Sequence, residues 1–271
     1  MKLKNRVALV TGANSGIGRA IAIAFAEQGA KVAVNGRNME RINGVVTEIE
    51  KLGGEAMGAP TDVAESSQVK DMFSKVLDRF GTIDILVNNA GHGGREEEVK
   101  KRQDQRIEEL STTGVAKTAI DPIRGMADEY WARTIAVHLS GTFYCTREAL
   151  NVMMDKGYGK IINVVSVAGI SGHPAAPDYA AAKGGVISFT KSVAVDVIVR
   201  GVYVNAIAPG MVETPLLGIW TERQVAMGIA QTPLGRMGAP EEISSTAVFL
   251  ASDDSSFIVG QVISPNGGSA V

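Results

Sequence analysis

Three residues in the second half of the chain have the types and the spacing for acid–base chemistry on an oxygen atom. Tyr179 and Lys183 stand four residues apart in DYAAAK, and Ser166 lies thirteen residues before Tyr179 in NVVS. Positions i and i+4 share one face of a helix, so the phenol and the ammonium can point into one site. A phenol has an ordinary pKa of about 10, and a nearby positive charge lowers that value. We therefore expect Tyr179 to donate a proton, with Ser166 as a hydroxyl donor to a carbonyl oxygen.

A glycine-rich segment near the start of the chain predicts a site for the phosphates of a dinucleotide. The segment VALVTGANSGIG places Gly12, Gly16 and Gly18 between an apolar run and a helical pattern. Glycine allows a tight turn and a close approach of backbone N–H groups to phosphate. The positive end of the helix that begins near Ile17 favours the same negative charge. A nucleotide site and a proton donor in one chain indicate hydride transfer.

The end of the second predicted strand bears on which nicotinamide cofactor the chain prefers. An acidic residue at this place, about 20 residues after the glycines, binds the ribose 2′-hydroxyl of NAD(H). Here Gly36 occupies the position and Arg37 follows it, and arginine pairs with a phosphate through two hydrogen bonds. Asn14, Ser15 and Asn38 can add neutral contacts. We predict NADP(H); the alternative is that Arg37 stacks on the adenine or faces solvent.

Short apolar runs alternate with longer helical patterns along the 271-residue chain. The predicted strands are residues 6–10, 31–35, 55–59, 83–87, 160–165, 203–208 and 261–264. The predicted helices are residues 17–28, 39–52, 65–80, 130–154, 179–199 and 241–250. Almost wholly apolar strands are typical of a parallel sheet that is buried on both faces. We expect a single α/β domain with a doubly wound parallel sheet of about seven strands flanked by helices.

The composition argues against several classes of function. The chain has 27 basic and 29 acidic residues, and a net charge of −2 does not indicate a nucleic-acid partner or an anionic membrane. One cysteine, Cys145, and three histidines give no metal-ligand spacing. The first strand begins without a signal peptide, and no apolar run is long enough to span a bilayer. We expect a cytoplasmic protein without a metal site.

One segment interrupts the alternation of strands and helices. After NNAG at 88–91, the next long helical pattern begins near residue 128, although most connections in such folds have about 2–6 residues. In this insert, residues 92–127, the charged stretch 95–110 places a base four positions after each of Glu96, Glu97 and Glu98. That spacing supports a helix that faces solvent. The alternative is a lid or a subunit contact beside the active site.

The motifs of the chain, taken in order, resemble those of the short-chain dehydrogenase/reductase family. They are TG at 11–12, the glycines at 16 and 18, DV at 62–63, NNAG at 88–91, the Ser–Tyr–Lys set, and PG at 209–210. The set is highly specific and covers nearly the whole chain, and the ending GQVISPNGG resembles the 3-oxoacyl-(acyl carrier protein) reductase-like branch. The resemblance implies a Rossmann-type fold and the reversible reduction of a ketone to a secondary alcohol with NADPH.

The resemblance also implies roles for residues outside the catalytic set. Asp62 would contact the adenine amino group, and Asn88 would stabilise the central strand. Lys183 would bind the nicotinamide ribose, and Thr214 would meet the carboxamide. The expected cofactor contacts are Gly12, Asn14, Ser15, Gly16, Ile17, Gly18, Arg37, Asn38, Asp62, Val63, Asn89, Ala90, Gly91, Tyr179, Lys183, Pro209, Gly210, Val212 and Thr214.

His138 departs from the family pattern. Where the family has VNLxGxF, with an asparagine that holds a water between the lysine and solvent, this chain reads VHLSGTF. Histidine exchanges protons and titrates near neutrality, so we place His138 among the catalytic residues as a relay. Two alternatives stay open: an impaired protein that acts as an NAD(P)(H)-binding sensor or scaffold, and a core histidine without a chemical role. His92 and His173 are weaker candidates at the mouth of the pocket.

Residues 211–236 are expected to form the substrate loop. Its segment 214–230 is apolar, which favours a hydrophobic or cyclic ketone, although the same residues can simply pack on the body of the protein. A substrate on an acyl carrier protein would need a basic patch, for which Arg95, Lys100, Lys101 and Arg102 are candidates diluted by glutamates. The resemblance implies a homotetramer that assembles through helices 130–154 and 179–199.

Overall fold

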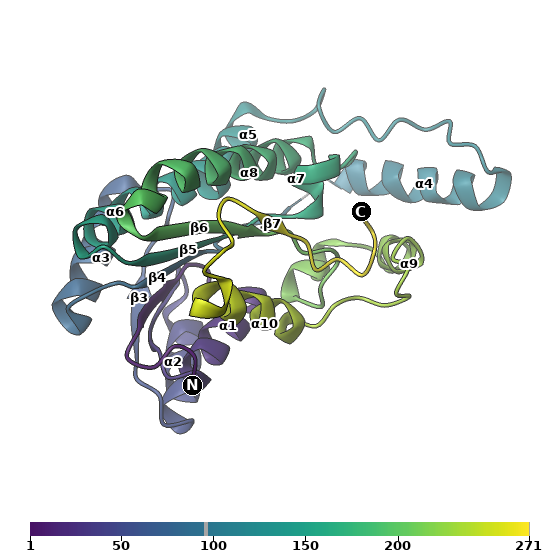
Figure 1. The fold of residues 1–271 in the computed structure, drawn as a ribbon. Coiled ribbons are helices and arrows are strands. Elements are labelled where there is room, and N and C mark those ends of the chain that lie inside the picture. The colour runs from purple at the N-terminus through teal and green to yellow at the C-terminus, as the bar shows by residue number, and fades with distance from the viewer. Residues whose placement is uncertain (95–96, 271) are drawn as a thin grey trace.

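The computed structural model describes residues 1–94 and 97–270. In this part of the chain, seven parallel strands form one sheet in the order β3-β2-β1-β4-β5-β6-β7 (Figure 1). The strands are β1 (Val7–Val10), β2 (Lys31–Gly36), β3 (Ala56–Pro60), β4 (Ile85–Asn88), β5 (Gly159–Val164), β6 (Val202–Ile207) and β7 (Val262–Ile263). The predicted doubly wound sheet is confirmed. The strand order reverses between β1 and β4, the place where such sheets bind ligands.

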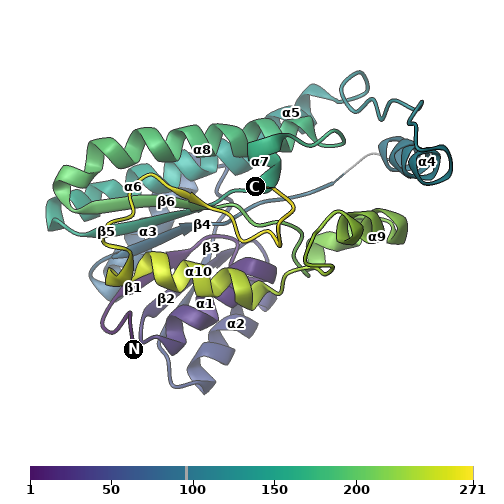
Figure 2. The ribbon, with the colours of Figure 1, turned by 45° about the vertical axis from the view of Figure 1, so that its right-hand side comes forward.

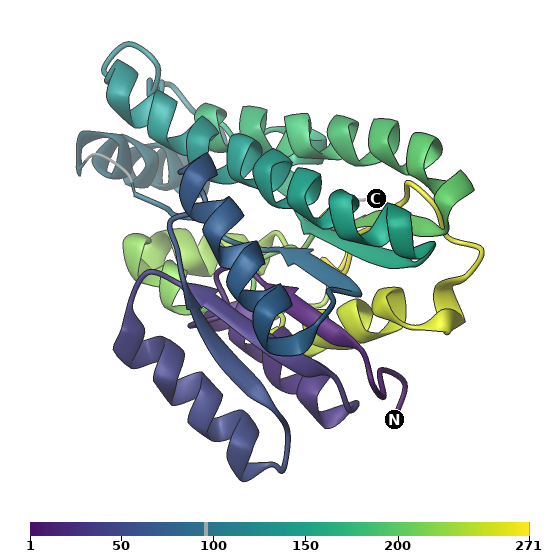
Figure 3. The same cartoon turned by 90° about the vertical axis from the view of Figure 1, so that its left-hand side faces the viewer.

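Helices cover both faces of the sheet (Figures 1 and 3). One layer holds α1 (Gly16–Glu27), α2 (Met39–Lys51) and α10 (Pro240–Ala251), and the other holds α3 (Ser66–Phe80), α6 (Gly141–Lys156) and α8 (Pro177–Val197). Alternate side chains of β1 serve the two layers, because Ala8 and Val10 pack in the first core and Val7 and Leu9 in the second. Burial on both faces explains why the strands are almost wholly apolar.

Buried amides tie the central strands to the helices above them. Asn88 Nδ2 donates to Thr146 Oγ1 at 3.1 Å and to Asn163 Oδ1 at 2.9 Å. Asn163 Nδ2 donates in turn to Thr190 Oγ1 at 2.8 Å. Buried polar groups are retained where they find such partners. Asn88 therefore links β4, β5 and α6, as the family resemblance implied.

The prediction of one continuous α-helix over residues 130–154 is corrected by the structure. The structure has α5 (Asp128–Ile135), then η1 (Ala136–Ser140) with π-helical hydrogen bonding, then α6. A π-helical turn inserts an extra residue into the helical repeat, and such turns are frequent at functional sites. His138 lies in η1. No local sequence signal distinguishes this turn from an ordinary α-helix.

Several short elements of the chain were not predicted. They are α7 (Val167–Ser171), η2 (Ile198–Arg200), η3 (Pro215–Ile219), α9 (Glu222–Ala230) and η4 (Asp253–Ser255). α9 had a signal, because Thr221 and Gln224 form a capping box in which each side chain bonds the other's backbone N–H. The expected substrate loop therefore contains a helix with a capped N-terminus.

The charged stretch of the insert forms α4 (Glu97–Thr113); the predicted residues 95 and 96 lie outside the described part. Arg102 Nε pairs with Glu98 at 3.1 Å, as the spacing predicted, whereas Lys100 pairs with Glu97 at 3.7 Å. Figures 1 and 2 show α4 and α9 side by side at one end of the sheet. α4 is therefore packed against the substrate loop and does not face solvent all round.

Candidate active site

The glycine turn between β1 and α1 has the conformation that its sequence predicted. Gly12 and Gly16 have φ angles of 62° and 54°, which favour glycine. A side-chain carbon at position 18 would lie 2.3 Å from the carbonyl oxygen of Gly12 and 2.4 Å from Asn89 Nδ2. Ile17 packs against the core. The turn can therefore bring its backbone close to a phosphate group.

The loop after β4 holds this turn from the neighbouring strand. Asn89 Nδ2 donates to the carbonyl oxygens of Thr11 and Gly12 at 3.0 and 3.2 Å. Thr11 Oγ1 accepts from the backbone N–H groups of Asn89 and Ala90 at 2.9 and 3.0 Å. The TG and NNAG motifs are thus bonded to each other, and the predicted contacts Asn89 and Ala90 lie beside the glycine turn.

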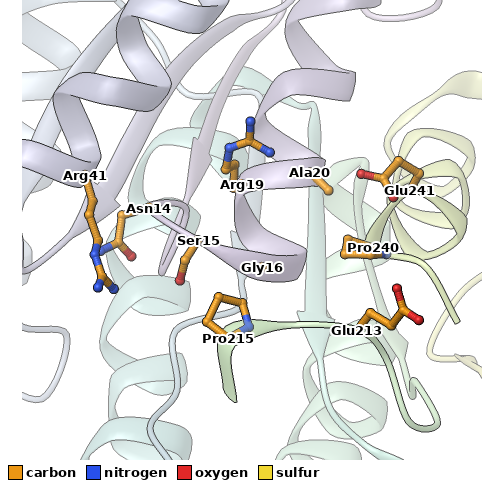
Figure 4. A pocket seen from close by; sticks show the side chains of 10 residues that line it. All are labelled: Asn14, Ser15, Gly16, Arg19, Ala20, Arg41, Glu213, Pro215, Pro240 and Glu241. Atoms are coloured by element: carbon orange, nitrogen blue, oxygen red, sulfur yellow. The ribbon is translucent and has the colours of Figure 1, made fainter. Parts of the chain in front are cut away.

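A pocket of about 390 Å³ opens at the N-terminus of α1 (Figure 4). Its lining residues are Asn14, Ser15, Gly16, Arg19, Ala20, Arg41, Glu213, Pro215, Pro240 and Glu241. Ser15 is the N-cap of α1, and within the described residues its hydroxyl makes no capping bond. The N–H groups of the first turn are therefore available to an anion. Tyr179 is not among its lining residues, so this pocket is separate from the Ser–Tyr–Lys set.

The end of β2 explains why no acidic residue stands at position 36. A side-chain carbon there would lie 2.7 Å from Asn14 Cγ, so any side chain at this position would require Asn14 to move. Arg37 is exposed, and Arg41 lies next to Asn14 and Ser15 (Figure 4). Asn38 has a structural use, since its Oδ1 accepts from the Arg41 N–H at 2.9 Å as the N-cap of α2.

Asp62 carries an ion pair that the sequence did not indicate. Its Oδ2 lies 2.6 Å from Arg133 Nη2 on α5, and its Oδ1 accepts from the Ala64 N–H at 3.0 Å. Burial raises the pKa of this carboxyl, but the bonds from Arg133 and Ala64 outweigh it and hold the pKa below its ordinary value. Val63 is buried against Gly141. The adenine contact of Asp62 stays a prediction for a carboxylate that α5 already holds.

The loop after β6 closes over the glycine turn. The Pro209 carbonyl accepts from the Val167 N–H at 3.2 Å. A side-chain carbon at position 210 would lie 2.9 Å from Asn266 Cα, and one at position 16 would lie 3.3 Å from Thr214. Val212 is buried. Of these predicted cofactor contacts, Thr214 therefore lies beside Gly16 of the glycine turn.

Ser166 and Tyr179 come together where β5 ends and α8 begins. Ser166 is the N-cap of α7, and its Oγ accepts from the Ala168 N–H at 3.2 Å. The same hydroxyl also acts on the phenol of Tyr179. Burial raises the pKa of Tyr179, and Ser166 opposes this rise. The phenol is therefore protonated at neutral pH, which is the form that can give a proton away.

Lys183 lies one turn after Tyr179 on α8. Its Nζ lies 5.7 Å from the centroid of the Tyr179 ring and donates to the Val164 carbonyl at 2.7 Å. Burial lowers the pKa of Lys183 to about 8. We expected Lys183 to lower the pKa of Tyr179, and the structure corrects this: burial raises that pKa, and the opposing effect comes from Ser166.

His138 packs edge-on against Tyr179, with ring centroids 5.1 Å apart. A side-chain carbon at position 91 would lie 2.7 Å from its Cε1, so Gly91 lets the NNAG loop approach the ring. His138 Nε2 lies 3.0 Å from the carbonyl oxygen of His92 and 3.3 Å from its N–H, so it has a partner in either tautomer. Its Nδ1 is buried without a partner among the described residues.

The electrostatics of His138 correct one expectation. Burial, with a smaller effect from the Lys183 charge, holds the pKa of His138 well below its ordinary range. The expectation that it titrates near neutrality is therefore wrong, and the ring is a neutral imidazole at physiological pH. A relay through it would have to exchange tautomers and could not store a proton.

The ring of His92 lies between those of His138 and Tyr130. Its ring centroid lies 5.4 Å from that of His138 and 6.1 Å from that of Tyr130. The Tyr130 hydroxyl donates to the Gly94 carbonyl at 2.7 Å. Burial and the Arg133 charge lower the pKa of His92. Residues 92–94 are thereby fixed between η1 and α5 at the edge of the site.

Sequence reasoning missed two basic residues of the site. Arg41 had a signal, because it lies four positions after Arg37 at the start of a predicted helix. Arg133 had none, because it pairs with Asp62 across 71 residues of sequence. Long-range ion pairs of this kind follow from the fold and cannot be read from spacing.

Two searches of the described residues gave negative findings. No cluster of three or more His, Cys, Asp or Glu side chains has an arrangement that could hold a metal ion. None of the helices in residues 1–94 and 97–270 is both long and apolar enough for a bilayer crossing.

Comparisons with known proteins agree with this geometry. The family model described as short chain dehydrogenase matches residues 6–224. The 3-oxoacyl-[acyl-carrier-protein] reductase FabG of Thermotoga maritima is 37% identical over 268 residues, which cover 99% of each chain. The (2S)-[(R)-hydroxy(phenyl)methyl]succinyl-CoA dehydrogenase subunit BbsD of Thauera aromatica is 35% identical over 268 residues, 99% of this chain and 98% of its own. The crystal structure of a short-chain type dehydrogenase/reductase from Mycobacterium marinum has a TM-score of 0.84 at 31% identity and covers 99% and 97% of the two chains.

The family match and the structure describe the same arrangement of motifs. The matched residues run from β1 through the glycine turn, the NNAG loop and the Ser–Tyr–Lys set to the substrate loop. The chain belongs to the short-chain dehydrogenase/reductase family of oxidoreductases, in the branch similar to 3-oxoacyl-[acyl-carrier-protein] reductases.

Proposed function

We propose that this protein reduces a ketone to a secondary alcohol, reversibly, with NADP(H) as its cofactor. The observation that carries the proposal is the convergence of Ser166, Tyr179 and Lys183 beside a glycine turn that has no room for a side chain at position 18. Such a turn, at a helix N-terminus with open N–H groups, fits a pyrophosphate. The bound nicotinamide would supply the hydride.

The protein's own residues would act on the substrate oxygen. Ser166 and Tyr179 hold the carbonyl oxygen between their hydroxyls, and Tyr179 gives its proton to that oxygen as the carbon is reduced. The phenolate that remains is stabilised by the Lys183 ammonium, whose Nζ lies 5.7 Å from the ring centroid. A raised pKa at Tyr179 suits this direction, because the donor is protonated before the reaction.

The preference for NADP(H) is supported by the end of β2. Asn14 occupies the space that an acidic side chain at position 36 would need. Arg41 is exposed and lines the pocket with Asn14 and Ser15, and exposed Arg37 follows Gly36 in the chain. Both can pair with a 2′-phosphate. Arg19 is already bound to Glu48 by two contacts of 2.6 and 2.7 Å, so we do not assign it to the phosphate.

His138 is proposed as a positioning residue for the NNAG loop. Its Nε2 meets the backbone of His92 in both tautomers, and its ring lies against Tyr179. The relay stays a prediction, limited to tautomer exchange by the low pKa. The sensor or scaffold alternative is not favoured, because the Ser–Tyr–Lys set is intact and its members lie together.

A cytoplasmic homotetramer also stays a proposal. Phe143 on α6 is 43% exposed and Val195 on α8 is 72% exposed, and these two helices are the expected interface. Apolar side chains at such positions are typical of association surfaces. Free, buried Cys145 is compatible with a reducing compartment.

Tyr179→Phe tests the proposed reaction. Because a positioned proton donor contributes about 10²–10⁴-fold, we expect kcat for ketone reduction to fall by at least about 100-fold. NADPH binding should stay close to that of the wild type. Turnover is followed as NADPH absorbance across β-ketoesters, cyclic diketones and simple ketones, and binding as NADPH fluorescence. Tyr144→Phe, a tyrosine on α6, is the matched control; retained turnover in Tyr179→Phe would refute the assignment.

Arg37→Asp tests the cofactor preference. A hydrogen bond to a charged group contributes about 1.5–3 kcal/mol, so the ratio of kcat/KM for NADPH over NADH should fall by about 10- to 100-fold. Arg41→Ala should lower the same ratio less, and the double variant should prefer NADH. Arg79→Ala, which breaks a pair with Glu55 on the far edge, is the control. An unchanged ratio in Arg37→Asp would remove the phosphate role.

The pKa of Lys183 predicts a pH limit for reduction. The ammonium is charged below about pH 8 and loses its proton above it. Because the charged form stabilises the phenolate, kcat/KM for the ketone should fall as the pH rises through this region. The profile is measured with NADPH in excess between pH 6 and 10. A profile that stays flat across this whole interval would exclude Lys183 as the titrating group.

Two substitutions at His138 separate positioning from proton relay. Glutamine reaches about as far as Nε2 and can both donate to and accept from the His92 backbone, whereas phenylalanine fills the space without bonds. We expect His138→Gln to keep turnover within about threefold of the wild type and His138→Phe to lose at least about 10-fold. If both variants lose activity equally, the imidazole itself takes part and the relay gains support.

A further inference from the structure

Two pairs of segments meet at the entrance to the site. The 92–94 segment touches η3, since a side-chain carbon at position 93 would lie 2.8 Å from Leu216 Cδ1 and 3.0 Å from Ile219 Cδ1. The loop before α8 touches the end of η3, where the rings of His173 and Trp220 lie 6.0 Å apart. The NNAG side and the Ser166 side of the site therefore both contact the substrate loop.

α4 is bonded to this substrate loop by a group of polar contacts, which we call the latch, made by Asp104, Thr221 and Gln224. Asp104 Oδ1 accepts from Thr221 Oγ1 at 2.8 Å and from Gln224 Nε2 at 3.1 Å. Gln224 Nε2 also lies 3.3 Å from the carbonyl oxygen of Lys100. Gln224 is only 2% exposed, so these bonds are shielded from water and are expensive to break singly. The exposed pair of Arg223 and Glu108, at 2.9 Å, adds little.

The insert is also fixed to the loop before α8. Val99 of α4, Ile120 of the returning segment and Ala175 form a small buried cluster. The returning segment is held to α4 by Glu109, which accepts from the backbone N–H groups of Lys117 and Thr118 at 2.6 and 2.8 Å. α4 therefore connects the loop before α8 to α9 of the substrate loop, through the Ala175 cluster at one end and the Gln224 bonds at the other.

The charges of the insert do not suit an acidic carrier protein. Residues 92–127 contain seven basic and seven acidic side chains. Arg102 is paired with Glu98 and Asp121, and Lys100 with Glu97. Two bases of the patch considered from the sequence, Lys100 and Arg102, are thus paired within the insert. Lys101 is exposed and makes no ion pair with the described residues, and Arg95 lies outside them. A docking surface for an anionic partner needs unpaired positive charge.

We propose that Asp104 and Gln224 are specificity-determining residues, which hold α4 on α9 so that the site admits a small free ketone and excludes substrates carried on a pantetheine arm. The inference rests on the proposed function. A small ketone can be enclosed behind the joined segments, whereas an arm that leads out to coenzyme A or a carrier protein must separate at least one of their contacts.

The test compares one acyl group in three forms with NADPH: ethyl acetoacetate, acetoacetyl-CoA and acetoacetyl carrier protein. The wild type should have the highest kcat/KM for the ethyl ester. Asp104→Ala and Gln224→Ala should each shift the ratio of kcat/KM towards acetoacetyl-CoA by about 10-fold, mainly through KM, because each removes bonds of the latch. Asp104→Asn keeps an acceptor oxygen for Thr221 and should shift the ratio less.

Gln105→Ala is the matched control, because Gln105 is the exposed neighbour of Asp104 and its amide contacts Glu109 within α4. It should leave the ratio unchanged. Circular dichroism and thermal unfolding identify a variant that does not fold, and the other of the two alanine variants then carries the test. A wild type that prefers either thioester, or latch variants that change all three substrates equally, would overturn the latch. Failure to reduce these substrates and the broader ketone panel would instead count against the proposed function.

Discussion

The site depends on the parallel register of β1, β4, β5 and β6, because only parallel strands bring all their carboxyl ends to one edge of a sheet. The glycine turn follows β1, the NNAG loop follows β4, Ser166 follows β5 and the loop with Thr214 follows β6. Bonds from Asn89 to Thr11 and Gly12 then lock two of these loops together. Residues far apart in sequence become one site through this register.

Burial is the main cause of the pKa shifts of Tyr179, Lys183 and His138. It raises the pKa of Tyr179, lowers that of Lys183 to about 8, and holds that of His138 well below its ordinary range. These shifts have opposite signs for one reason, because a low dielectric disfavours the charged form of both acids and bases. The result is a neutral phenol and a neutral imidazole beside an ammonium that is still charged at neutral pH. This state is suited to giving a proton to a substrate oxygen.

Much of the fold and the motif set could be predicted because their signals are local. Apolar runs marked the strands, glycines with no room for Cβ marked the turn, and the spacing of Tyr179 and Lys183 marked one helical face. The π-helical turn at His138 and the pair of Asp62 with Arg133 were missed, since both depend on packing between distant segments. The expected net lowering of the pKa of Tyr179 was wrong for the same reason, because spacing gives proximity but burial decides the direction of the shift.

The insert shows where sequence patterns lose their meaning. Glutamates four residues before bases support a helix in water, yet the same helix carries Asp104 and Val99 on contacts with α9 and the loop before α8. The i to i+4 spacing of charges predicts ion pairs within a helix, but it does not predict polar contacts of that helix with other elements. A buried Gln224 has to be paired, so the position of α4 is fixed by side chains that look solvent-facing in the sequence. Loops on a rigid sheet can in this way change which substrates reach a site while the catalytic residues stay where the fold puts them.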